Sequence, residues 1–472
     1  MNSFPAFATA SPSLELPSPA VLRRFDVSGP RYTSYPTADR FVDAFTADDY
    51  IQALHQRSAT GMHGRPLSLY VHLPFCESLC YYCACNKIVT RHKHWAVEYL
   101  DYLERELALQ VAALGRGAVV SQVHLGGGTP TFLDDEGLGR LLAMLGREFT
   151  LSPEREQSIE IDPRTVDGAR LERLARLGFN RLSFGVQDFD PDVQKAVHRI
   201  QPAAEVFDLM ASARSLGFRS INIDLIYGLP KQSRASFDRT LAQVCDLRPD
   251  RIALYAYAHL PERFKPQRRI AAEDLPDAKT KVEMLSRAIA AFTAAGYVYI
   301  GMDHFALPDD PLAIAKRQGR LHRNFQGYST QPDCDLVALG VSAIGRVGAT
   351  YSQNAKTLEE YYDLVDQGRI PVVRGLALTR DDVLRRAVIM AIMCQGQVDF
   401  ETISLAHLID FKDHFAHELA ALGPLAAQGL VRVSERDLEV TPTGWFFVRA
   451  IAMAFDRYLQ ADRNRSRFSR IV

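Results

Sequence analysis

Residues 68–88 of the chain read SLYVHLPFCESLCYYCACNKI. This stretch opens with an apolar segment, Ser68–Pro74, that predicts a β-strand. Four cysteines then fall within ten residues: Cys76, Cys80, Cys83 and Cys85. A strand that runs directly into clustered cysteines predicts a functional loop at the carboxyl end of that strand.

Strand patterns of the same kind recur along the chain and alternate with helical patterns. The other predicted strands are Ser121–Leu125, Ser158–Ile161, Arg181–Gly185, Ser220–Tyr227, Arg251–Tyr257 and Tyr297–Gly301. Residues 95–114, 135–149 and 281–296 repeat apolar side chains at three- and four-residue spacing, which predicts helices. Six or seven such repeats imply parallel strands joined by right-handed crossovers. The predicted fold class is therefore α/β, as a whole or partial (β/α) barrel or an open doubly wound sheet.

Unusual polar residues and glycines follow these strands at the edge where a parallel sheet forms its site. They are Gly126–Thr129 after the second strand, Glu160 and Asp162 at the end of the third, Gln187 after the fourth and Asp224 on the fifth. A single acid at a strand end is more often structural than functional, but a set on one rim favours a site. The run GGGTPT lacks the spacing of a phosphate-binding loop, and its glycines would let the backbone approach a ligand closely.

The chain changes character outside the repeats. Residues 1–20, rich in Ser, Pro and Ala, predict a disordered tail, and residues 21–67 predict an N-terminal arm that includes RYTSYPTADRF (31–41). Residues 68–374 are predicted to form the barrel and a substrate-side extension. Residues 375–472 are mainly helical in pattern, with one hairpin in residues 430–441, and predict a separate C-terminal domain.

Composition excludes several classes of protein. Of 472 residues, 47% are hydrophobic and 24% are charged, as in ordinary globular proteins. The formal net charge of −1 gives no reason to expect nucleic acid or a membrane surface as a partner. We find no apolar run near 18 residues, and the N-terminus resembles neither a signal peptide nor an Arg-rich transit peptide. A cytoplasmic location is therefore expected.

Three kinds of site compete for the cysteines. Structural zinc usually takes two separated pairs of ligands, whereas these four cysteines adjoin. An electron-transfer cluster uses four cysteines, often with a remote fourth, and no convincing remote ligand is found. The third kind is a [4Fe-4S] cluster held by three cysteines, with one iron open to a ligand. An odd total of seven cysteines argues against a disulfide framework, and we assign no role to Cys245, Cys334 and Cys394.

The x3–x2 spacing after the first strand resembles the radical S-adenosylmethionine (SAM) superfamily. Longer motifs resemble one of its families, the bacterial oxygen-independent coproporphyrinogen III oxidases: YVHLPFCESLCYYCACNKIVTR, HLGGGTPTFL, EIDPRT, LSFGVQDFD, NIDLIYGLPKQ, LHRNFQGYST and LGVSAI. This resemblance implies a partial barrel with an N-terminal arm and a mainly helical C-terminal domain. The implied reaction converts two propionates of coproporphyrinogen III to vinyl groups, giving protoporphyrinogen IX in haem biosynthesis.

The resemblance also implies roles for particular residues. Cys76, Cys80 and Cys83 match the cluster ligands, and Cys85 matches a further cysteine needed for activity. Two SAM molecules are implied. Tyr70, Gly127, Glu160 and Ile344 match contacts of the first, and Tyr82, Gly128, Thr129, Gln187, Arg199, Asp224 and Ala258 match contacts of the second. Tyr82 stands where phenylalanine is commoner, and since both rings can stack we expect little change.

The substrate and the partners are less closely specified. A substrate with four carboxylates needs basic and amide donors, for which Arg31, Arg40, His322, Arg323 and Asn324 are candidates from charge and position. The resemblance implies an external electron donor and acceptor and a monomer. One alternative stays open, because a sister group of haem-binding chaperones retains the three cluster cysteines. Cys85, RYTSYPT and HRNFQGYST favour the oxidase.

Overall fold

A computed structural model of the chain describes residues 18–25, 27–59, 65–331 and 333–461. The predicted tail lies outside the described residues up to residue 17, and helix α1 (Pro19–Phe25) follows. The chain divides into two compact units. One is Thr33–Val383, and the other combines the N-terminal residues up to Tyr32 with the chain from Leu384 onward.

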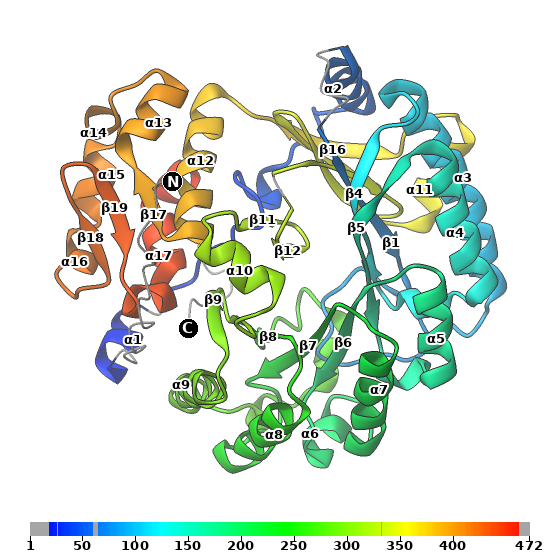
Figure 1. Cartoon of the computed structure of the whole chain (residues 1–472), viewed down its shortest axis with the longest axis horizontal. Helices are drawn as coiled ribbons and strands as arrows, with labels where there is room; N and C mark the ends of the chain where they lie inside the picture. The colour runs from blue at the N-terminus through cyan, green and yellow to red at the C-terminus, as the bar shows by residue number, and fades with distance from the viewer. Residues whose placement is uncertain (1–17, 26, 60–64, 332, 462–472) are drawn as a thin grey trace, which may run out of the picture. The chain divides into compact units, whose positions relative to one another are not determined.

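The larger unit is built on one open sheet of twelve strands (Figure 1). In sheet order they are β16 (Val372–Ala377), β15 (Thr350–Asn354), β14 (Ile344–Val347), β13 (Asp335–Leu339), β1 (Leu67–Leu73), β4 (Val119–Gly127), β5 (Thr150–Ile161), β6 (Arg181–Gln187), β7 (Ser220–Tyr227), β8 (Arg251–Ala256), β10 (His304–Ala306) and β9 (Val298–Gly301). The strands from β13 to β8 pair in parallel. The predicted α/β fold with a partial (β/α) barrel is confirmed.

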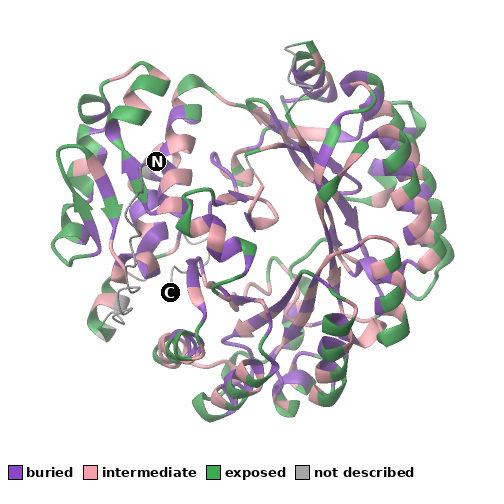
Figure 2. Ribbon diagram, in the orientation of Figure 1, coloured by how far each residue is buried: buried purple, intermediate pink, exposed green. Residues whose placement is uncertain are grey.

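Helices cover the outer side of the parallel strands (Figure 1). They are α3 (His94–Leu114), α4 (Asp135–Glu148), α5 (Gly168–Arg176), α7 (Ala203–Ser215), α8 (Arg234–Leu247) and α9 (Ala278–Ala294). The strands are largely buried and the helices expose their outward faces (Figure 2), which explains the apolar strand runs and the amphipathic helix pattern. Shorter helices complete the unit: α2 (Ala47–Ala59), α6 (Pro191–Ala196), α10 (Pro311–Arg317) and α11 (Leu358–Asp366).

One expectation about the strands was wrong, and further strands lie where none was predicted. The segment predicted as a seventh parallel strand, β9, pairs antiparallel with β10, which in turn pairs antiparallel with β8. The chain turns back at Met302 and Asp303, both at positive φ, so a hairpin replaces a crossover. Regular structure also continues beyond residue 305, because β13 joins β1 and the hairpins β14–β16 extend that edge.

A buried carboxylate ties helix α3 to this extension. Glu106 accepts hydrogen bonds from Gln110 Nε2 (2.9 Å), Gly340 N (2.8 Å), Asn354 Nδ2 (2.8 Å) and Tyr361 Oη (2.6 Å). Burial raises the pKa of Glu106 even though these donors oppose the change. Since a buried carboxylate is costly unless its acceptors are filled, this network fixes the order of β13 and β15 beside α3.

The part of the predicted N-terminal arm that belongs to the larger unit begins at Thr33. Val42 bridges Gly375 of β16, and the Phe41 ring stacks on Tyr351 of β15 with centroids 5.6 Å apart. The hydroxyl of Tyr351 donates to the carbonyl of Tyr35 at 3.3 Å. The aromatic residues of the arm therefore cover the antiparallel edge of the sheet.

The smaller unit is mainly helical and contains the predicted hairpin. Its elements are the part of α12 (Arg380–Gln395) from Leu384, then β17 (Gln397–Asp399), α13 (Phe400–His407), α14 (Phe411–His414), α15 (Ala416–Ala421), α16 (Gly423–Ala426), β18 (Val431–Val433), β19 (Asp437–Val440), α17 (Val448–Met453) and α18 (Arg457–Ala461). Strands β18 and β19 form the hairpin, and β17 adds a third strand. Tyr32 donates from its hydroxyl to Asp456 Oδ2 at 2.9 Å, which joins the two ends of the chain.

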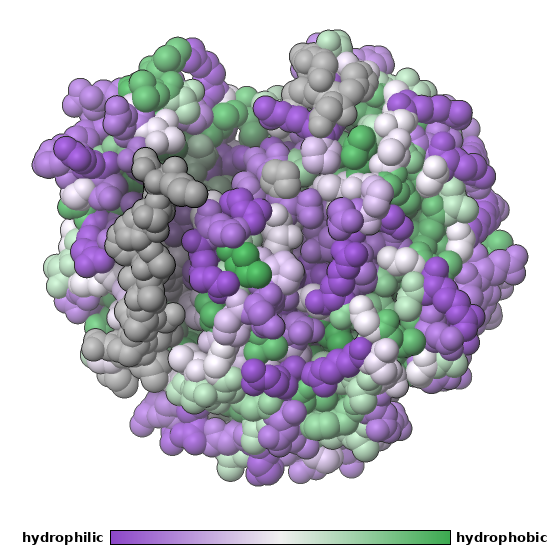
Figure 3. Space-filling view, viewed as in Figure 1, coloured by the Kyte–Doolittle hydropathy of each residue, from purple (hydrophilic) through white to green (hydrophobic). Residues whose placement is uncertain are grey.

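No helix in the described ranges combines the length and the apolar character that a membrane span needs. On the face seen in Figure 3, hydrophilic and apolar side chains are interspersed.

Candidate active site

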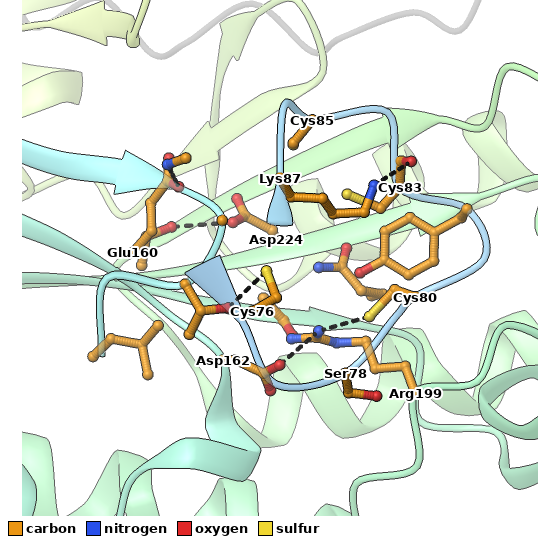
Figure 4. Close-up of a pocket in the computed structure, with 18 residues that line it drawn as sticks. Cys76, Ser78, Cys80, Cys83, Cys85, Lys87, Glu160, Asp162, Arg199 and Asp224 are labelled. Carbon is orange, nitrogen blue, oxygen red and sulfur yellow. Dashed lines mark hydrogen bonds and ion pairs between the residues drawn. The ribbon is translucent and has the colours of Figure 1, made fainter. Parts of the chain in front are cut away.

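A cavity of about 230 Å³ lies at the carboxyl ends of the parallel strands (Figure 4). Its lining comprises Cys76, Ser78, Cys80, Tyr82, Cys83, Cys85, Lys87, Gly127, Gly128, Thr129, Glu160, Ile161, Asp162, Ser183, Gly185, Gln187, Arg199 and Asp224. All four clustered cysteines line the cavity. Cys76 and Cys80 are buried, Cys83 is half-buried and Cys85 is exposed. The structure therefore brings together most of the residues predicted from separate strands.

The cysteine loop is closed by its own short strands. β2 (Phe75–Cys76) pairs in parallel with β3 (Ile88–Val89), and the backbone of Thr90 donates to the carbonyl of Cys76 at 2.9 Å. Lys87 Nζ donates to the carbonyl of Cys83 at 3.0 Å. The loop is thus held at both ends, and its four cysteines line the cavity (Figure 4).

The glycine run packs the second strand against this loop. A Cβ at Gly128 would lie 2.5 Å from the carbonyl oxygen of Pro74, and one at Gly127 would lie 2.7 Å from the His72 ring. Gly127 also has φ +117°, which strains any other residue. In this structure the close approach is to the chain itself, whereas the sequence had suggested an approach to a ligand.

Two guanidinium groups flank the sulfur of Cys80. Arg199 Nη1 lies 3.4 Å from Cys80 Sγ, and Arg164 Nη2 lies 3.5 Å from it. Asp162 pairs with both arginines, at 3.1 Å to Arg199 and 2.6 Å to Arg164. Burial opposes the charge on Asp162, but the two arginines hold its pKa below the usual value. Arg164 was not among the predicted site residues, although it lies in the EIDPRT motif, and Asp162 was predicted only as a residue of the polar rim.

Glu160 is held in place by donors from two directions. Gly127 N donates to Oε2 at 3.1 Å, and His124 Nε2 lies 3.3 Å from Oε1. Burial opposes the charge on Glu160, but these two donors keep its pKa below the usual value. His124 also contacts Ser158 Oγ at 2.6 Å through its other ring nitrogen. An ionised, oriented carboxylate can accept hydrogen bonds from an ammonium or a ribose hydroxyl.

Asp224 lies on the neighbouring wall of the cavity. It accepts hydrogen bonds from Asn222 Nδ2 (2.9 Å) and Ser183 Oγ (3.1 Å). Burial, and then the charge of Glu160, raise the pKa of Asp224 to about 6. Gln187 stands at φ +70°, where the pairing of β6 with β7 shifts register. Such a left-handed residue at a bulge turns its side chain toward the cavity, a device common beside active sites.

Three predicted cofactor contacts do not line the cavity. Tyr70 lies on β1, with its hydroxyl 3.0 Å from His72 Nδ1. The carbonyl of Ala258 accepts from Gln267 Nε2 at 3.2 Å, and Ile344 begins β14. Their assignments stay predictions.

The donor set fits an iron–sulfur cluster, because four thiols line one cavity and thiolates are the usual ligands of such clusters. Neighbouring donors reach their sulfur atoms. Thr129 Oγ1 lies 3.5 Å from Cys76 Sγ, and a hydrogen bond with Cys85 lowers the pKa of Cys83 to about 6. Such donors stabilise thiolate ligands and tune clusters.

The predicted substrate contacts fall in both units. Arg31 belongs to the smaller unit, whereas Arg40, His322, Arg323 and Asn324 belong to the larger one. Arg323 is buried at 5% exposure, with its guanidinium 4.6 Å from the centre of the Tyr328 ring. It lies in the hairpin of β11 (His322–Asn324) and β12 (Gly327–Ser329), so packing is part of its role.

Sequence reasoning missed a group of cations beside the cysteine loop. Asn86 Nδ2 donates to the carbonyl of Lys356 at 3.0 Å. Burial lowers the pKa of Lys356, and the charges of Arg374 and Arg263 lower it further. These three residues come from distant segments with no shared motif.

Comparisons with known proteins agree with this geometry. The Radical SAM superfamily profile matches residues 70–244, and the HemN C-terminal domain profile matches residues 378–447. The chain is 49% identical to the oxygen-independent coproporphyrinogen III oxidases of Pseudomonas aeruginosa and Escherichia coli, covering 96% of this chain and 98% of each relative. The crystal structure of the Escherichia coli coproporphyrinogen III oxidase superposes with a TM-score of 0.88 at 46% identity, covering 94% of this chain and 99% of that one.

Proposed function

Because the chain belongs to the family of oxygen-independent coproporphyrinogen III oxidases, we propose that the cavity between the cysteine loop and Asp224 is its catalytic centre. The protein is a radical SAM enzyme of haem biosynthesis that uses a [4Fe-4S] cluster and SAM. The haem-chaperone alternative is not favoured, since the relatives that match nearly end to end are oxidases. The observation that carries the site assignment is the meeting of the cysteines, Glu160, Gln187, Arg199 and Asp224 around one cavity.

Cys76, Cys80 and Cys83 would hold the cluster. Bound there, the cluster and SAM would supply a 5′-deoxyadenosyl radical to remove a hydrogen atom from a substrate propionate, and CO2 and one electron would then leave, the electron passing to the external acceptor. The chain's own side chains bind the cofactor and orient it. The Glu160 carboxylate accepts from a cofactor ammonium or hydroxyl, and the Arg199 guanidinium pairs with a cofactor carboxylate. Cys85, exposed at the mouth of the loop, is needed for activity without being a ligand.

Two SAM molecules bind in this site. Support comes from the lining of the cavity, which contains predicted contacts of both molecules: Glu160 for the first, and Gln187 and Asp224 for the second. Tyr70 and Ile344 complete the first set, and Ala258 completes the second.

The substrate carboxylates bind to basic and amide groups of the larger unit. Arg40, His322, Arg323 and Asn324 remain the proposed contacts there, and Arg31 stays a separate candidate in the smaller unit. The exposed Lys356, whose carbonyl is bonded to Asn86, joins them with Arg374. Burial, and then the charges of Arg374 and Arg263, lower the pKa of Lys356, and a bound carboxylate would offset the repulsion between these cations.

The remaining proposals concern the location, oligomeric state, redox partners and domains of the enzyme. The enzyme works as a cytoplasmic monomer with an external electron donor and acceptor. Residues 68–374 carry the radical chemistry and the substrate-side extension. Residues 21–67 form the arm, of which Tyr35, Phe41 and Val42 contact one edge of the sheet. Residues 375–472 act as a helical C-terminal domain.

The test is anaerobic turnover. The protein is reconstituted with iron and sulfide, then given SAM, dithionite and coproporphyrinogen III, and protoporphyrinogen and 5′-deoxyadenosine are followed together. Both products are expected, and Cys80→Ala should abolish both. Deoxyadenosine without a vinyl product would point to another substrate. Neither product with a full cluster would return the haem chaperone to consideration.

A further inference from the structure

A basic surface lies on the outer side of the cysteine loop. Two segments form it, residues 192–200 and residues 262–269. Their exposed charged side chains are the cations Lys195, Arg263, Lys265, Arg268 and Arg269 and the anions Asp192 and Glu262. Within the described ranges none of these five cations forms an ion pair, whereas the nearby Lys231 and Arg239 are paired with Asp274 and Asp190. The excess of positive charge contrasts with the net −1 of the whole chain.

An aromatic contact lies next to these cations. The Tyr81 ring stacks on the exposed His198 with centroids 5.1 Å apart and an interplanar angle of 10°. The Arg269 guanidinium lies 5.2 Å from the same ring, and its Nη1 donates to the Tyr81 hydroxyl at 3.3 Å. Ile200 follows at 64% exposure. Aromatic and aliphatic side chains surrounded by charge are the usual anatomy of a protein interface.

This surface is one residue away from a predicted cluster ligand. Tyr81 follows Cys80 directly, and its backbone N donates to the carbonyl of Val197 at 3.0 Å. His198 is exposed, while the next residue, Arg199, is buried and places Nη1 3.4 Å from Cys80 Sγ (Figure 4). The opposite side of the loop faces the cavity. A partner on the basic surface could therefore exchange an electron with the site without entering it.

We propose that the surface formed by Lys195, His198, Lys265, Arg268 and Arg269 docks an acidic, low-potential one-electron carrier protein, such as a flavodoxin. The proposal rests on the proposed function, which requires an external reductant. The reduced carrier gives up one electron at this surface and no atom is transferred. Charge complementarity brings the partners together, and Tyr81 and Ile200 form the contact centre.

The test compares two doubly charge-reversed proteins. Lys265→Glu/Arg268→Glu removes exposed cations that have no ion pair. The matched control is Arg65→Glu/Arg219→Glu, whose exposed side chains precede β1 and β7 at the opposite ends of the strands. The probe is an acidic flavodoxin: its oxidised form is used for binding by titration calorimetry, and its photoreduced form is used to drive SAM cleavage. Dithionite-driven cleavage is measured in parallel.

At low salt we expect the test variant to bind oxidised flavodoxin at least tenfold more weakly than the control does. Its flavodoxin-driven cleavage should fall to a similar degree, while dithionite-driven cleavage stays unchanged. The difference in flavodoxin binding between the variants should vanish in 0.5 M salt, because the salt screens the attraction between the basic surface and the acidic carrier. Equal binding by both variants, or equal losses in both, would overturn the docking site. Failure of dithionite-driven cleavage in the unaltered protein would instead refute the proposed function. The comparison of flavodoxin binding by the two variants would still test whether the basic surface is the docking site.

Discussion

Arg164 donates a hydrogen bond from Nη2 to the sulfur of Cys80 at 3.5 Å, from a guanidinium that Asp162 holds at 2.6 Å. A cationic donor to a ligand sulfur stabilises the more negative, reduced form of a cluster. Arg164 is therefore a positioning residue that acts through Cys80.

Replacing Arg164 should lower the reduction potential of the reconstituted cluster. For Arg164→Gln we expect a roughly tenfold shift of the redox equilibrium toward the oxidised form, about 59 mV for one electron. Potentiometric titration followed by electron paramagnetic resonance measures this shift. Arg173→Gln is the control, because it lies on α5 without contact to a cysteine. An unchanged potential in Arg164→Gln would remove this role.

The four cysteines should separate into two groups. Cys80→Ser should lose most of the bound iron, because two ligands cannot retain the cluster. Cys85→Ser should keep iron and its absorbance but lose protoporphyrinogen formation. Iron and sulfide assays on the reconstituted proteins decide the first point, and product chromatography decides the second. Loss of iron in Cys85→Ser would mean that Cys85 is a ligand.

Gly128 should tolerate no side chain. A Cβ there would lie 2.5 Å from the backbone oxygen of Pro74, so Gly128→Ala must push the second strand away from the cysteine loop. We expect a loss of about 1–3 kcal/mol of stability, as for other overpacked sites, together with weak cluster retention. Gly139→Ala in α4 is the control, since its Cβ would meet nothing closer than 3.8 Å. Urea unfolding of both variants tests this, and equal midpoints would contradict it.

Asp224 should make the cluster-free protein less stable as pH rises. Its pKa is raised to about 6 in the folded protein from 3.8, so the folded state binds the extra proton. The associated stability is complete below pH 3.8 and is lost as pH rises through 6. Asp224→Asn should therefore unfold at higher urea concentration than the unaltered protein at pH 7.5, with the difference closing by pH 4. If the two proteins differ in urea midpoint by the same amount at both pH values, the raised pKa of Asp224 is not the cause of the difference in stability.

Lys356 should act on substrate binding more than on folding. Its side chain is exposed, so Lys356→Gln should raise the KM for coproporphyrinogen III about tenfold, a typical effect for a lost charged hydrogen bond, with little change in Tm. The buried Arg323 differs, since Arg323→Ala should lower Tm as well as raise KM. Steady-state kinetics and thermal unfolding separate the two. An unchanged KM in both variants would show that neither Lys356 nor Arg323 binds the substrate carboxylates.

Local patterns predicted the parallel strands because β1, β4 and β7 are short apolar runs whose burial on both faces leaves a direct mark in the sequence. The β9–β10 hairpin was mistaken for a crossover because its strands look alike in either direction. The strands β13–β16 were missed because their pairing depends on long-range contacts, such as that of Glu106 with Gly340.

The cysteine spacing, the strand–helix alternation and the rim of polar residues can be predicted from local sequence, because each is set by neighbours in the chain. Three arrangements become visible only in the folded chain: Arg164 and Arg199 share Asp162 beside Cys80, the glycine run packs on Pro74, and Lys356 lies beside Asn86. Those contacts join segments far apart in sequence, and their partners are chosen by the closure of the sheet rather than by any local pattern.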